Sequence, residues 1–558
     1  MAARERSFWG WGWADAFPDA SARRATGGMV SALLGGAALE VREPPRLDSI
    51  QLAAPRVAVP AQLAGFVKGD REARARHTYG RSYRDLARGF AGRFEPAPDL
   101  VAFPPDEDAI WALYDFCAAR QLALIPFGGG TSVVGGVEAE VGSEFAGAVS
   151  VDLGRLDRVV EVDPVSRAAR IQAGATGPAL ERALAAHGFT LRHFPQSFEF
   201  STLGGWIATR AGGHFATLST HIDDLVESVR MLTPRGVWES RRLPASGAGP
   251  SPDRLVLGSE GILGVITEAW MRVRPRPRWR ASVSLRFREF AGAVRATREL
   301  AQSDLYPTNC RLLDAAEAML HRVVGDGSSV LLVGFESADH PLEPWMARAL
   351  EIGRGQGGAG EPRFSDDGAG SGSGSDTARA AGSGSGTGPA TGSGTGPGNA
   401  TESWRSAFLD APYLFNTLVS LGCVVDTFET ACTWNRFEAL DQSIREAVTS
   451  AMRSECGGGV LSCRFTHVYP DGPAPYYTFV APGRPGAELD QWRAIKAAAS
   501  DAIIAGGATI THHHAVGRTH RPWYERERPE PFALALRGAK RAVDPDGFLN
   551  PGVLLAPE

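Results

Sequence analysis

The sequence predicts an α+β protein of more than one domain. The chain has 558 residues, which is more than a single hydrophobic core usually organises. Its hydrophobic share of 43% and charged share of 22% are ordinary for a soluble globular enzyme. Beyond residue 94, short apolar runs typical of strands alternate with amphipathic segments typical of helices. These observations together favour two α+β domains behind an N-terminal extension.

Residues 1–94 are expected to form this extension and to pack on the body of the protein. The stretch is rich in Pro and Arg and is predicted to be irregular. Its aromatic motif, Phe8-Trp9-Gly10-Trp11-Gly12-Trp13, indicates an anchor buried against the domains. The first residues lack the apolar core and small-residue cleavage site of a signal peptide. We therefore expect a cytoplasmic protein.

Residues 95–278 are expected to form the first domain. A short apolar run at 122–126 has the character of a buried strand and leads into a glycine-rich loop. Helices are predicted over 109–121 and 179–187, and further strands over 148–153 and 159–162. The glycine-rich loop therefore starts where a buried strand ends.

Residues 279–540 are expected to form a second α+β domain. Strands are predicted over 280–287, 329–336 and 461–468, and helices over 292–303, 438–454 and 491–505. A flexible insertion is expected at 356–400. Residues 365–400 contain no Val, Leu, Ile, Met, Phe, Trp, Tyr or Cys, so they cannot bury apolar surface to offset their ordering entropy.

The most informative stretch is Pro126-Phe-Gly-Gly-Gly-Thr-Ser-Val-Val-Gly-Gly136. Glycines reach positive φ and let backbone N–H groups approach an anion closely, and Thr131 and Ser132 add hydroxyl donors. The pattern is typical of a loop that cradles a pyrophosphate, although a tight turn would use similar residues. It is neither the GxGxxG that opens a Rossmann helix nor the GxxxxGK[ST] of a P-loop.

Three later segments accompany this loop: Gln172–Thr176, Thr202–Thr209 and Gly258–Thr267. In this order and spacing they resemble the FAD-binding domain of the vanillyl-alcohol oxidase / p-cresol methylhydroxylase type. The resemblance implies a two-subdomain FAD-binding domain followed by an α+β substrate (cap) domain. It also implies that FAD is contacted by Pro126, Gly128, Gly129, Gly130, Thr131, Ser132, Thr202, Gly204, Gly205, Thr209, Glu260, Gly261 and Ile266.

Some members of that family tether the flavin through a histidine in or near the first loop. Residues 126–138 contain no His and no Cys, so neither usual tethering side chain is available there. Non-covalent FAD is therefore expected.

A second signal is Thr509-Ile-Thr-His-His-His-Ala-Val-Gly-Arg518, which begins in a short strand predicted at 508–510. If the segment is extended, His512 and His514 share one face and His513 points away. This geometry argues against a simple three-ligand metal site, and no metal is expected. We favour histidines that act as polar groups on a substrate. A metal site and a purely structural cluster remain as alternatives.

The histidine segment resembles the His-His-His-Gly-Val-Gly-Lys segment of the alkyldihydroxyacetonephosphate synthase family. Related FAD-dependent 2-hydroxy-acid dehydrogenases carry Glu-His-Gly there, and a histidine after an upstream Gly-Asp-Gly-Asn motif. This chain keeps Asp471-Gly472 upstream but lacks that histidine, which favours the synthase. The resemblance implies that Tyr476, which precedes the histidines by about the family's spacing, is the catalytic tyrosine, with Tyr477 as the fallback.

The same resemblance assigns two further regions. Cys310-Arg311-Leu-Leu-Asp314 is similar to the family's Ile-Arg-Leu-Met-Asp, whose arginine helps to hold the anionic substrate, so Arg311 is assigned to the phosphate. Residues 541–558 contain Asp-Pro-Asp-Gly-Phe-Leu-Asn-Pro-Gly, which is similar to the motif by which many members return the chain to the FAD domain.

One position departs from the family pattern. The family usually has Tyr-Ile/Leu-Arg-Asp, with an arginine implicated in the active site, whereas this chain has Tyr413-Leu414-Phe415-Asn416. Phe415 cannot supply the paired hydrogen bonds of a guanidinium. Arg405 is the candidate to compensate for it.

The resemblance implies that the chain exchanges the acyl group of 1-acyl-dihydroxyacetone phosphate for a fatty alcohol, in a redox-neutral reaction through a flavin N5 adduct. Tyr476 would remove the C1 proton, His512, His513 and His514 would polarise the ketone and shuttle protons, and Arg311 would hold the phosphate. Two alternatives stay open: an FAD-linked oxidase or dehydrogenase of a 2-hydroxy acid or alcohol, and a flavin-binding protein without catalytic activity.

Partners follow from composition and from this resemblance. The formal net charge of −5 gives no electrostatic reason to expect nucleic acid. None of the six cysteines forms a CxxC pair, which argues against zinc and dithiol chemistry. Lipid substrates imply transient contact with a membrane surface, and homodimers are common among the relatives.

Overall fold

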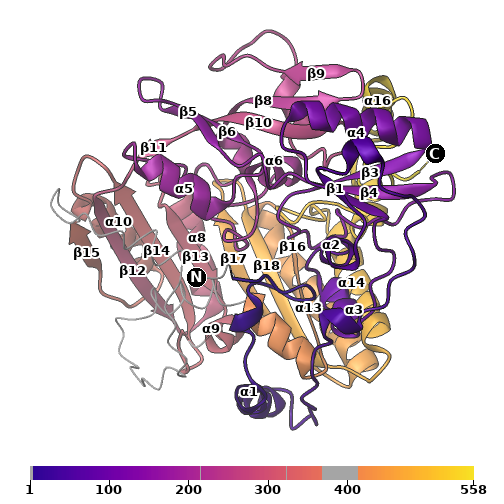
Figure 1. The fold of residues 1–558 in the computed structure, drawn as a ribbon. Coiled ribbons are helices and arrows are strands. Elements are labelled where there is room, and N and C mark those ends of the chain that lie inside the picture. Colours follow the sequence, from indigo (N-terminus) through magenta and orange to yellow (C-terminus); the bar gives the residue numbers. More distant parts are fainter. Residues whose placement is uncertain (1–3, 214, 322, 367–411, 558) are drawn as a thin grey trace.

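The computed structural model describes residues 4–557, except for 214, 322 and 367–411. Most of the expected flexible insertion lies outside the described residues, as does Arg405. Two groups of sheets form the body (Figure 1): strands β1 to β10 on one side, and a large sheet formed by strands β12 to β18 on the other. The cavity that carries the candidate site is lined from both groups.

The first sheet has the strand order β1-β2-β4-β3. Strands β2, β4 and β3 are parallel, and β1 joins antiparallel at the edge. β3 has the continuous apolar character of a strand buried on both faces. The elements are β1 (Val67–Lys68), β2 (Leu100–Ala102), α4 (Glu107–Arg120), β3 (Leu122–Phe127) and β4 (Gly147–Asp152).

The second sheet is antiparallel, with the order β5-β6-β10-β8-β9. Helices α5 and α6 lie against it, and a short β7–β11 pair follows the sheet. Its elements are β5 (Val159–Asp163), β6 (Ala168–Gln172), α5 (Gly177–Ala185), β7 (Phe189–Thr190), α6 (Leu203–Thr209), β8 (Val226–Thr233), β9 (Gly236–Glu239), α7 (Pro252–Val256), β10 (Val265–Arg272) and β11 (Arg274–Pro275). The first domain thus holds two sheets, as a two-subdomain FAD-binding domain requires.

The second domain is built on an antiparallel sheet with the order β15-β12-β14-β13-β17-β18-β16. Helices α8 and α10 pack near β12 to β14, and α13 and α14 pack along each other beside β16 to β18. The elements are β12 (Trp279–Phe287), α8 (Phe290–Ala301), β13 (Asn309–Leu313), α9 (Ala315–Leu320), β14 (Ser329–Ser337), α10 (Glu343–Gly355), β15 (Arg363–Asp366), β16 (Cys423–Glu429), α13 (Trp434–Cys456), β17 (Val460–Val468), β18 (Pro473–Pro482) and α14 (Glu488–Ala505).

The start of the expected insertion at 356–400 differs in the structure. Residues Arg363–Asp366 form β15, which pairs antiparallel with β12. Arg278 reinforces this edge, since its guanidinium is paired with the Asp366 carboxylate at 2.8 Å. The sheet therefore extends into a stretch that composition alone assigns to the insertion.

The N-terminal extension is more regular than expected. It contains the helices α1 (Ala20–Leu33), α2 (Arg71–Arg76) and α3 (Tyr83–Phe90), each with an Asp or Ser side chain that accepts a hydrogen bond from the first turn. Trp9 is buried with its ring edge-on to Phe17 and Phe90. The aromatic motif therefore lies in the core that the extension shares with the second domain.

The C-terminal segment follows α15 (Arg521–Glu527) and α16 (Glu530–Val543). Leu124 of β3 and Leu549 form an isolated parallel bridge, and the Asn550 side chain donates to the carbonyl oxygen of Glu260 at 2.7 Å. The end of the chain thus lies against the first domain. Among the residues described, no helix is both long and apolar enough to cross a bilayer.

Candidate active site

A cavity of about 260 Å³ carries the candidate site. The glycine loop and α6 form one wall, and strands of the second domain form the other. The residues expected to contact the cofactor all line it: Pro126, Gly128, Gly129, Gly130, Thr131, Ser132, Thr202, Gly204, Gly205, Thr209, Glu260, Gly261 and Ile266. Tyr476, Arg311, His513 and His514 line the same cavity, whereas His512 does not.

The glycine loop lies too close to its surroundings to carry side chains. A Cβ on Gly129 would meet the carbonyl oxygen of Phe200 at 1.9 Å. Gly130 has a φ of +63°, where residues with a side chain are strained. The Ser132 hydroxyl accepts from the backbone N–H of Gly136 at 3.0 Å and so orders the loop. The result is a backbone cradle of the kind that suits a pyrophosphate.

Two other expected cofactor residues organise the wall beside the loop. The Thr202 hydroxyl caps α6 by accepting from the backbone N–H of Gly205. The buried Glu260 carboxylate accepts from the backbone N–H groups of Val516 and Gly517, at 3.0 and 2.9 Å. Burial raises the pKa of Glu260 to about 7. Its side chain therefore joins the histidine segment to the first domain.

Tyr476 lies on β18, opposite Arg464 of β17 and Glu429 of β16. Its hydroxyl donates to the Thr427 hydroxyl at 2.9 Å, and the Arg464 guanidinium lies 4.0 Å from the centre of its ring. Burial raises the pKa of Tyr476 to about 12, against the opposing effect of the Arg464 charge. The resting residue is therefore a neutral phenol.

The fallback residue Tyr477 lies on the other face of β18, because successive strand residues point to opposite sides. Its hydroxyl donates to Asp441 at 2.8 Å, and its ring stacks on Phe428. It does not line the cavity. Of the two tyrosines, only Tyr476 can reach a molecule bound there.

Residues 508–510 do not form the predicted strand, and the three histidines that follow lie in a bend. The backbone N–H groups of His512, His513 and His514 converge on Oε1 of Glu429 at 3.1, 2.6 and 2.6 Å. One buried carboxylate thus pulls three successive amides to one side, which an extended strand does not allow. The expectation that His513 points away is therefore wrong, since His513 and His514 both face the cavity.

The buried Glu429 carboxylate lies against His513 and His514. Burial alone would raise the pKa of Glu429, but His513 and His514 hold it well below its usual range. The Nδ1 atom of His513 lies 2.5 Å from Oε2 of Glu429. Burial lowers the pKa of His514 to about 3, so that ring is neutral at physiological pH and can donate from one nitrogen only.

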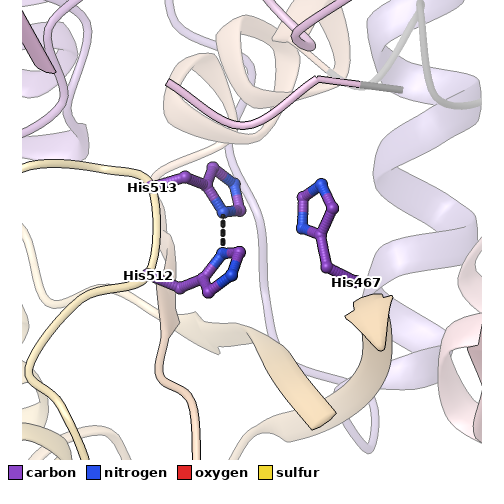
Figure 2. A group of neighbouring side chains, drawn as sticks. All are labelled: His467, His512 and His513. Atoms are coloured by element: carbon purple, nitrogen blue, oxygen red, sulfur yellow. Dashed lines mark hydrogen bonds between the residues drawn. The ribbon is translucent and has the colours of Figure 1, made fainter. Parts of the chain in front are cut away.

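Two groups of described residues place three donor atoms within 4.8 Å of one another: His467 with His512 and His513, and Glu429 with His513 and His514. Figure 2 shows the first group, in which Nδ1 of His512 and Nδ1 of His513 are 3.0 Å apart. In both groups most donor atoms are already engaged in hydrogen bonds to one another. The arrangement therefore favours a hydrogen-bonded network over a metal centre.

Two buried arginines, Arg311 of β13 and Arg464, make this end of the cavity cationic. Arg464 donates to Glu317 at 2.6 Å. Burial lowers the pKa of Arg311 to about 9, and the Arg464 charge lowers it further in the same direction. Arg311 therefore keeps its charge at neutral pH, and the two guanidinium groups form a site suited to an anion. Arg464 appears in the sequence beside Cys463, but nothing there assigns it this role.

Apolar residues of the N-terminal motif and the second domain line another part of the cavity: Trp11, Leu414, Phe415, Leu418, Val425 and Val480. The helix over residues 412–420 supplies Phe415, at the position of the missing family arginine. Trp11 is held there by Asn416, whose side chain accepts from the Trp11 N–H at 2.8 Å and donates to its carbonyl at 2.9 Å. This long-range pair has no sequence signal.

Comparisons with known proteins agree with this geometry. The FAD binding domain family matches residues 98–240, and the family of FAD linked oxidases, C-terminal domain, matches residues 276–554, half of the chain. An alkyldihydroxyacetonephosphate synthase from Dictyostelium discoideum is 31% identical over 497 residues, covering 88% of this chain and 79% of the relative.

Solved structures show the same similarity. A structure of an alkyldihydroxyacetonephosphate synthase has a TM-score of 0.76 and 25% identity, and covers 98% of each chain. A structure of p-cresol methylhydroxylase, at 13% identity, has a TM-score of 0.64 and covers 88% of this chain and 93% of its own. The second likeness shows the fold alone, and it confirms the predicted α+β architecture of the vanillyl-alcohol oxidase type.

Proposed function

This chain belongs to the alkyldihydroxyacetonephosphate synthase family, and from that premise we propose that it exchanges the acyl group of 1-acyl-dihydroxyacetone phosphate for a fatty alcohol. One observation carries the proposal. Tyr476, the histidines His513 and His514 and the buried arginines Arg311 and Arg464 share a single cavity with the glycine loop. The cavity also has an apolar side, so it suits a substrate with an anionic head and a long alkyl chain.

FAD is the cofactor, as the FAD binding domain match indicates. The residues present fit it, because the glycine cradle has no room for added side chains and opens into the cavity beside Tyr476. Bound there, FAD supplies an electrophilic centre for the exchange without net electron transfer. We propose that it is held without a covalent bond.

We assign the phosphate group to Arg311 and Arg464, two buried arginines on the second-domain side of the cavity. Charge-assisted hydrogen bonds to a phosphate are shorter and stronger than neutral ones. The alkyl chain would lie against Trp11, Leu414 and Phe415. In this arrangement Phe415 contacts the chain and the two arginines replace the cation that the family pattern places at residue 415.

Tyr476 is the proposed base that removes the proton from C1, which the adjacent ketone acidifies. Burial opposes loss of the phenol proton, and Arg464, stacked on the ring, is the group that stabilises the phenolate. Neutral His514 lines the cavity and is placed to donate a hydrogen bond to the ketone oxygen. The oxygen gains negative charge in this step, and the hydrogen bond stabilises it.

A second candidate is an FAD-linked oxidase or dehydrogenase of a 2-hydroxy acid or alcohol. Phe415 favours it, because a guanidinium that the synthases usually carry is missing. Such an enzyme would bleach the flavin with its substrate and pass electrons to oxygen or a dye.

The deciding experiment is anaerobic. Purified yellow protein is mixed with palmitoyl-dihydroxyacetone phosphate and labelled hexadecanol, and the ether product is measured by mass spectrometry. We expect product from the wild type and from the control Tyr477→Phe if that variant folds, and none from Tyr476→Phe. Absence of product, together with bleaching by a 2-hydroxy acid, would move the chain to the second candidate.

Two partner proposals belong to the same function. We propose transient contact with a membrane surface, since both substrates are lipids, and a homodimer. Flotation with anionic and neutral vesicles tests the first, and light scattering after size-exclusion chromatography tests the second. Protein that stays at the bottom of the gradient, or elutes with the mass of one chain, contradicts the respective proposal.

A further inference from the structure

His512 stands apart from the other two histidines of its segment. His513 and His514 line the cavity, whereas His512 does not. Its ring lies next to that of His513, and the two Nδ1 atoms are 3.0 Å apart (Figure 2). A role for His512 in catalysis must therefore pass through another residue.

On its far side, His512 contacts Tyr469 of the second domain and His221 of the first domain. Its Nε2 lies 2.7 Å from the Tyr469 hydroxyl and 3.2 Å from Nε2 of His221. The Tyr469 hydroxyl also contacts the Thr220 hydroxyl at 2.9 Å. His221 is only partly buried. A continuous series of hydrogen bonds thus leads from the cavity wall at His513 to the partly exposed His221.

The proton positions along this series follow from one fixed acceptor. Nδ1 of His221 lies 2.9 Å from the carbonyl oxygen of Arg210, and a carbonyl can only accept, so this Nδ1 carries the hydrogen. Neutral His221 then presents a lone pair at Nε2. A continuous series requires that the Nε2–H of His512 is shared between this lone pair and the closer Tyr469 hydroxyl oxygen, which leaves the Tyr469 hydroxyl to donate to Thr220. Nδ1 of His512 is then an acceptor, and the Nδ1–H of His513 is shared between it and Oε2 of Glu429.

The same reasoning gives the tautomer at the cavity end of the series. With Nδ1 protonated and facing His512 and Glu429, His513 has its lone pair on Nε2. Burial lowers the pKa of His512 and of His221, which agrees with neutral rings. Every ring therefore donates in the same direction, away from the cavity.

We propose that His513, His512 and His221 form a proton wire that exchanges the substrate proton with water, and that Tyr469 positions His512 within it. The inference rests on the proposed function. Nε2 of His513 takes the C1 proton, directly or from the Tyr476 hydroxyl, and its Nδ1 proton moves to Nδ1 of His512. The Nε2 proton of His512 moves to Nε2 of His221, and the Nδ1 proton of His221 leaves its hydrogen bond with the Arg210 carbonyl and passes to water.

No electrons are transferred in these steps. Each N–H bond that breaks is matched by one that forms on the next ring. Because the proposed exchange first removes a proton at C1 and later returns one, the wire runs once in each direction. The return passage restores the original tautomers, and no ring has to rotate.

The test is run in D2O with the FAD-loaded enzyme, palmitoyl-dihydroxyacetone phosphate and hexadecanol. Mass spectrometry gives both the amount of ether product and its deuterium content at C1. We expect wild-type product to carry deuterium at C1. In His221→Ala the deuterium content per product should fall about tenfold, and added imidazole should restore it, because His221 is accessible. In Tyr469→Phe the deuterium content should fall by less, and imidazole should not restore it.

His187→Ala is the matched control, since His187 is exposed and remote from the series. A His221→Ala enzyme that matches this control in both deuterium content and turnover overturns the wire. If the wild type forms no ether product, the proposed function fails, and the resting tautomers decide the wire separately. ¹⁵N-histidine spectra should show His512 protonated at Nε2 and His513 at Nδ1; a His512 protonated at Nδ1 contradicts it.

Discussion

The guanidinium of Arg464 lies 4.0 Å from the ring centre of Tyr476, and the two residues are direct partners on β17 and β18. A cation over an aromatic ring in a buried site is worth roughly 2 kcal/mol, and the phenolate gains more from it than the phenol. The contact with Arg464 therefore makes it easier for Tyr476 to lose its proton.

The first prediction separates this effect from folding. Arg464→Met alone would leave Glu317 as a buried carboxylate without its main ion-pair partner, so the double variant Glu317→Gln, Arg464→Met is compared with Glu317→Gln. We expect the pKa of Tyr476 to rise by about one unit. At neutral pH kcat/KM should then fall about tenfold and recover as the pH rises. An unchanged pH profile would show that Arg464 does not act on Tyr476.

The second prediction concerns Glu429, whose Oε1 accepts from three successive backbone amides. In Glu429→Gln a neutral side-chain amide replaces the carboxylate, whose Oε2 faces Nδ1 of His513. We expect the free energy of unfolding to drop by about 3 kcal/mol, as measured by urea titration at pH 7. The exposed Glu438→Gln on α13 serves as the control and should change by less than about 0.5 kcal/mol.

The pH dependence of this contribution has a definite sign. The folded pKa of Glu429 lies well below the ordinary value of 4.5. Its stabilisation is therefore fully present above that value and is lost as the pH falls through the lowered pKa. The wild type and Glu429→Gln should consequently converge in stability in strong acid. A difference that stays constant down to pH 2 would contradict this assignment.

The success and failure of sequence-based prediction here have a common cause. The glycine loop could be predicted because its function depends on consecutive residues, and every expected cofactor residue reaches the cavity. Tyr476 and Tyr477 could not be separated by spacing, but strand alternation separates them. The strand at 508–510 was wrong because Glu429, on a distant strand, determines the local conformation. The pairing of Trp11 with Asn416 joins residues 405 positions apart in the sequence and has no local pattern.

The third prediction uses a histidine outside the cavity. His193 is fully buried beside Trp206, and neither ring nitrogen has a hydrogen-bond partner among the described residues. Burial lowers its pKa to about 3. Below about pH 6.5 the unfolded chain binds a proton that the folded chain does not. The free energy of unfolding therefore decreases as the pH is lowered.

His193→Met removes that term. Between pH 6 and pH 4.5 we expect its free energy of unfolding to fall less steeply than that of the wild type, by about 1.4 kcal/mol per pH unit. Urea titrations at several pH values give the slope. The exposed His187→Met is the control and should keep the wild-type slope. A His193→Met slope equal to that of the control would mean that His193 is protonated in the folded protein.

The fourth prediction concerns attachment of the cofactor. The glycine loop offers no tethering side chain, and the cavity-lining histidines all belong to the second domain: His321, His467, His513 and His514. Acid precipitation should therefore release the flavin, and its absorbance should appear in the supernatant. A yellow pellet, or flavin fluorescence that stays with the denatured chain on a gel, would show a covalent bond.

The last prediction tests the clasp between the N-terminal motif and the helix over 412–420. Asn416 both accepts from and donates to the Trp11 backbone, whereas an aspartate there can only accept. Asn416→Asp would place a carboxylate oxygen against the Trp11 carbonyl, a buried mismatch that costs about 2 kcal/mol. We expect the N-terminal segment to loosen, with a red shift of tryptophan fluorescence and faster proteolysis near residue 13.

The matched control is Asn435→Asp, at an exposed residue whose side-chain oxygen accepts from Thr433, a role that a carboxylate keeps. Because Trp11 lines the cavity beside Phe415, loosening of the segment should also weaken retention of FAD on dilution, which the control should not. If Asn416→Asp matches the control in fluorescence, proteolysis and FAD retention, the clasp is not held by Asn416. If only FAD retention is unchanged, the segment moves without opening the cofactor site, and Trp11 serves the alkyl side of the cavity alone.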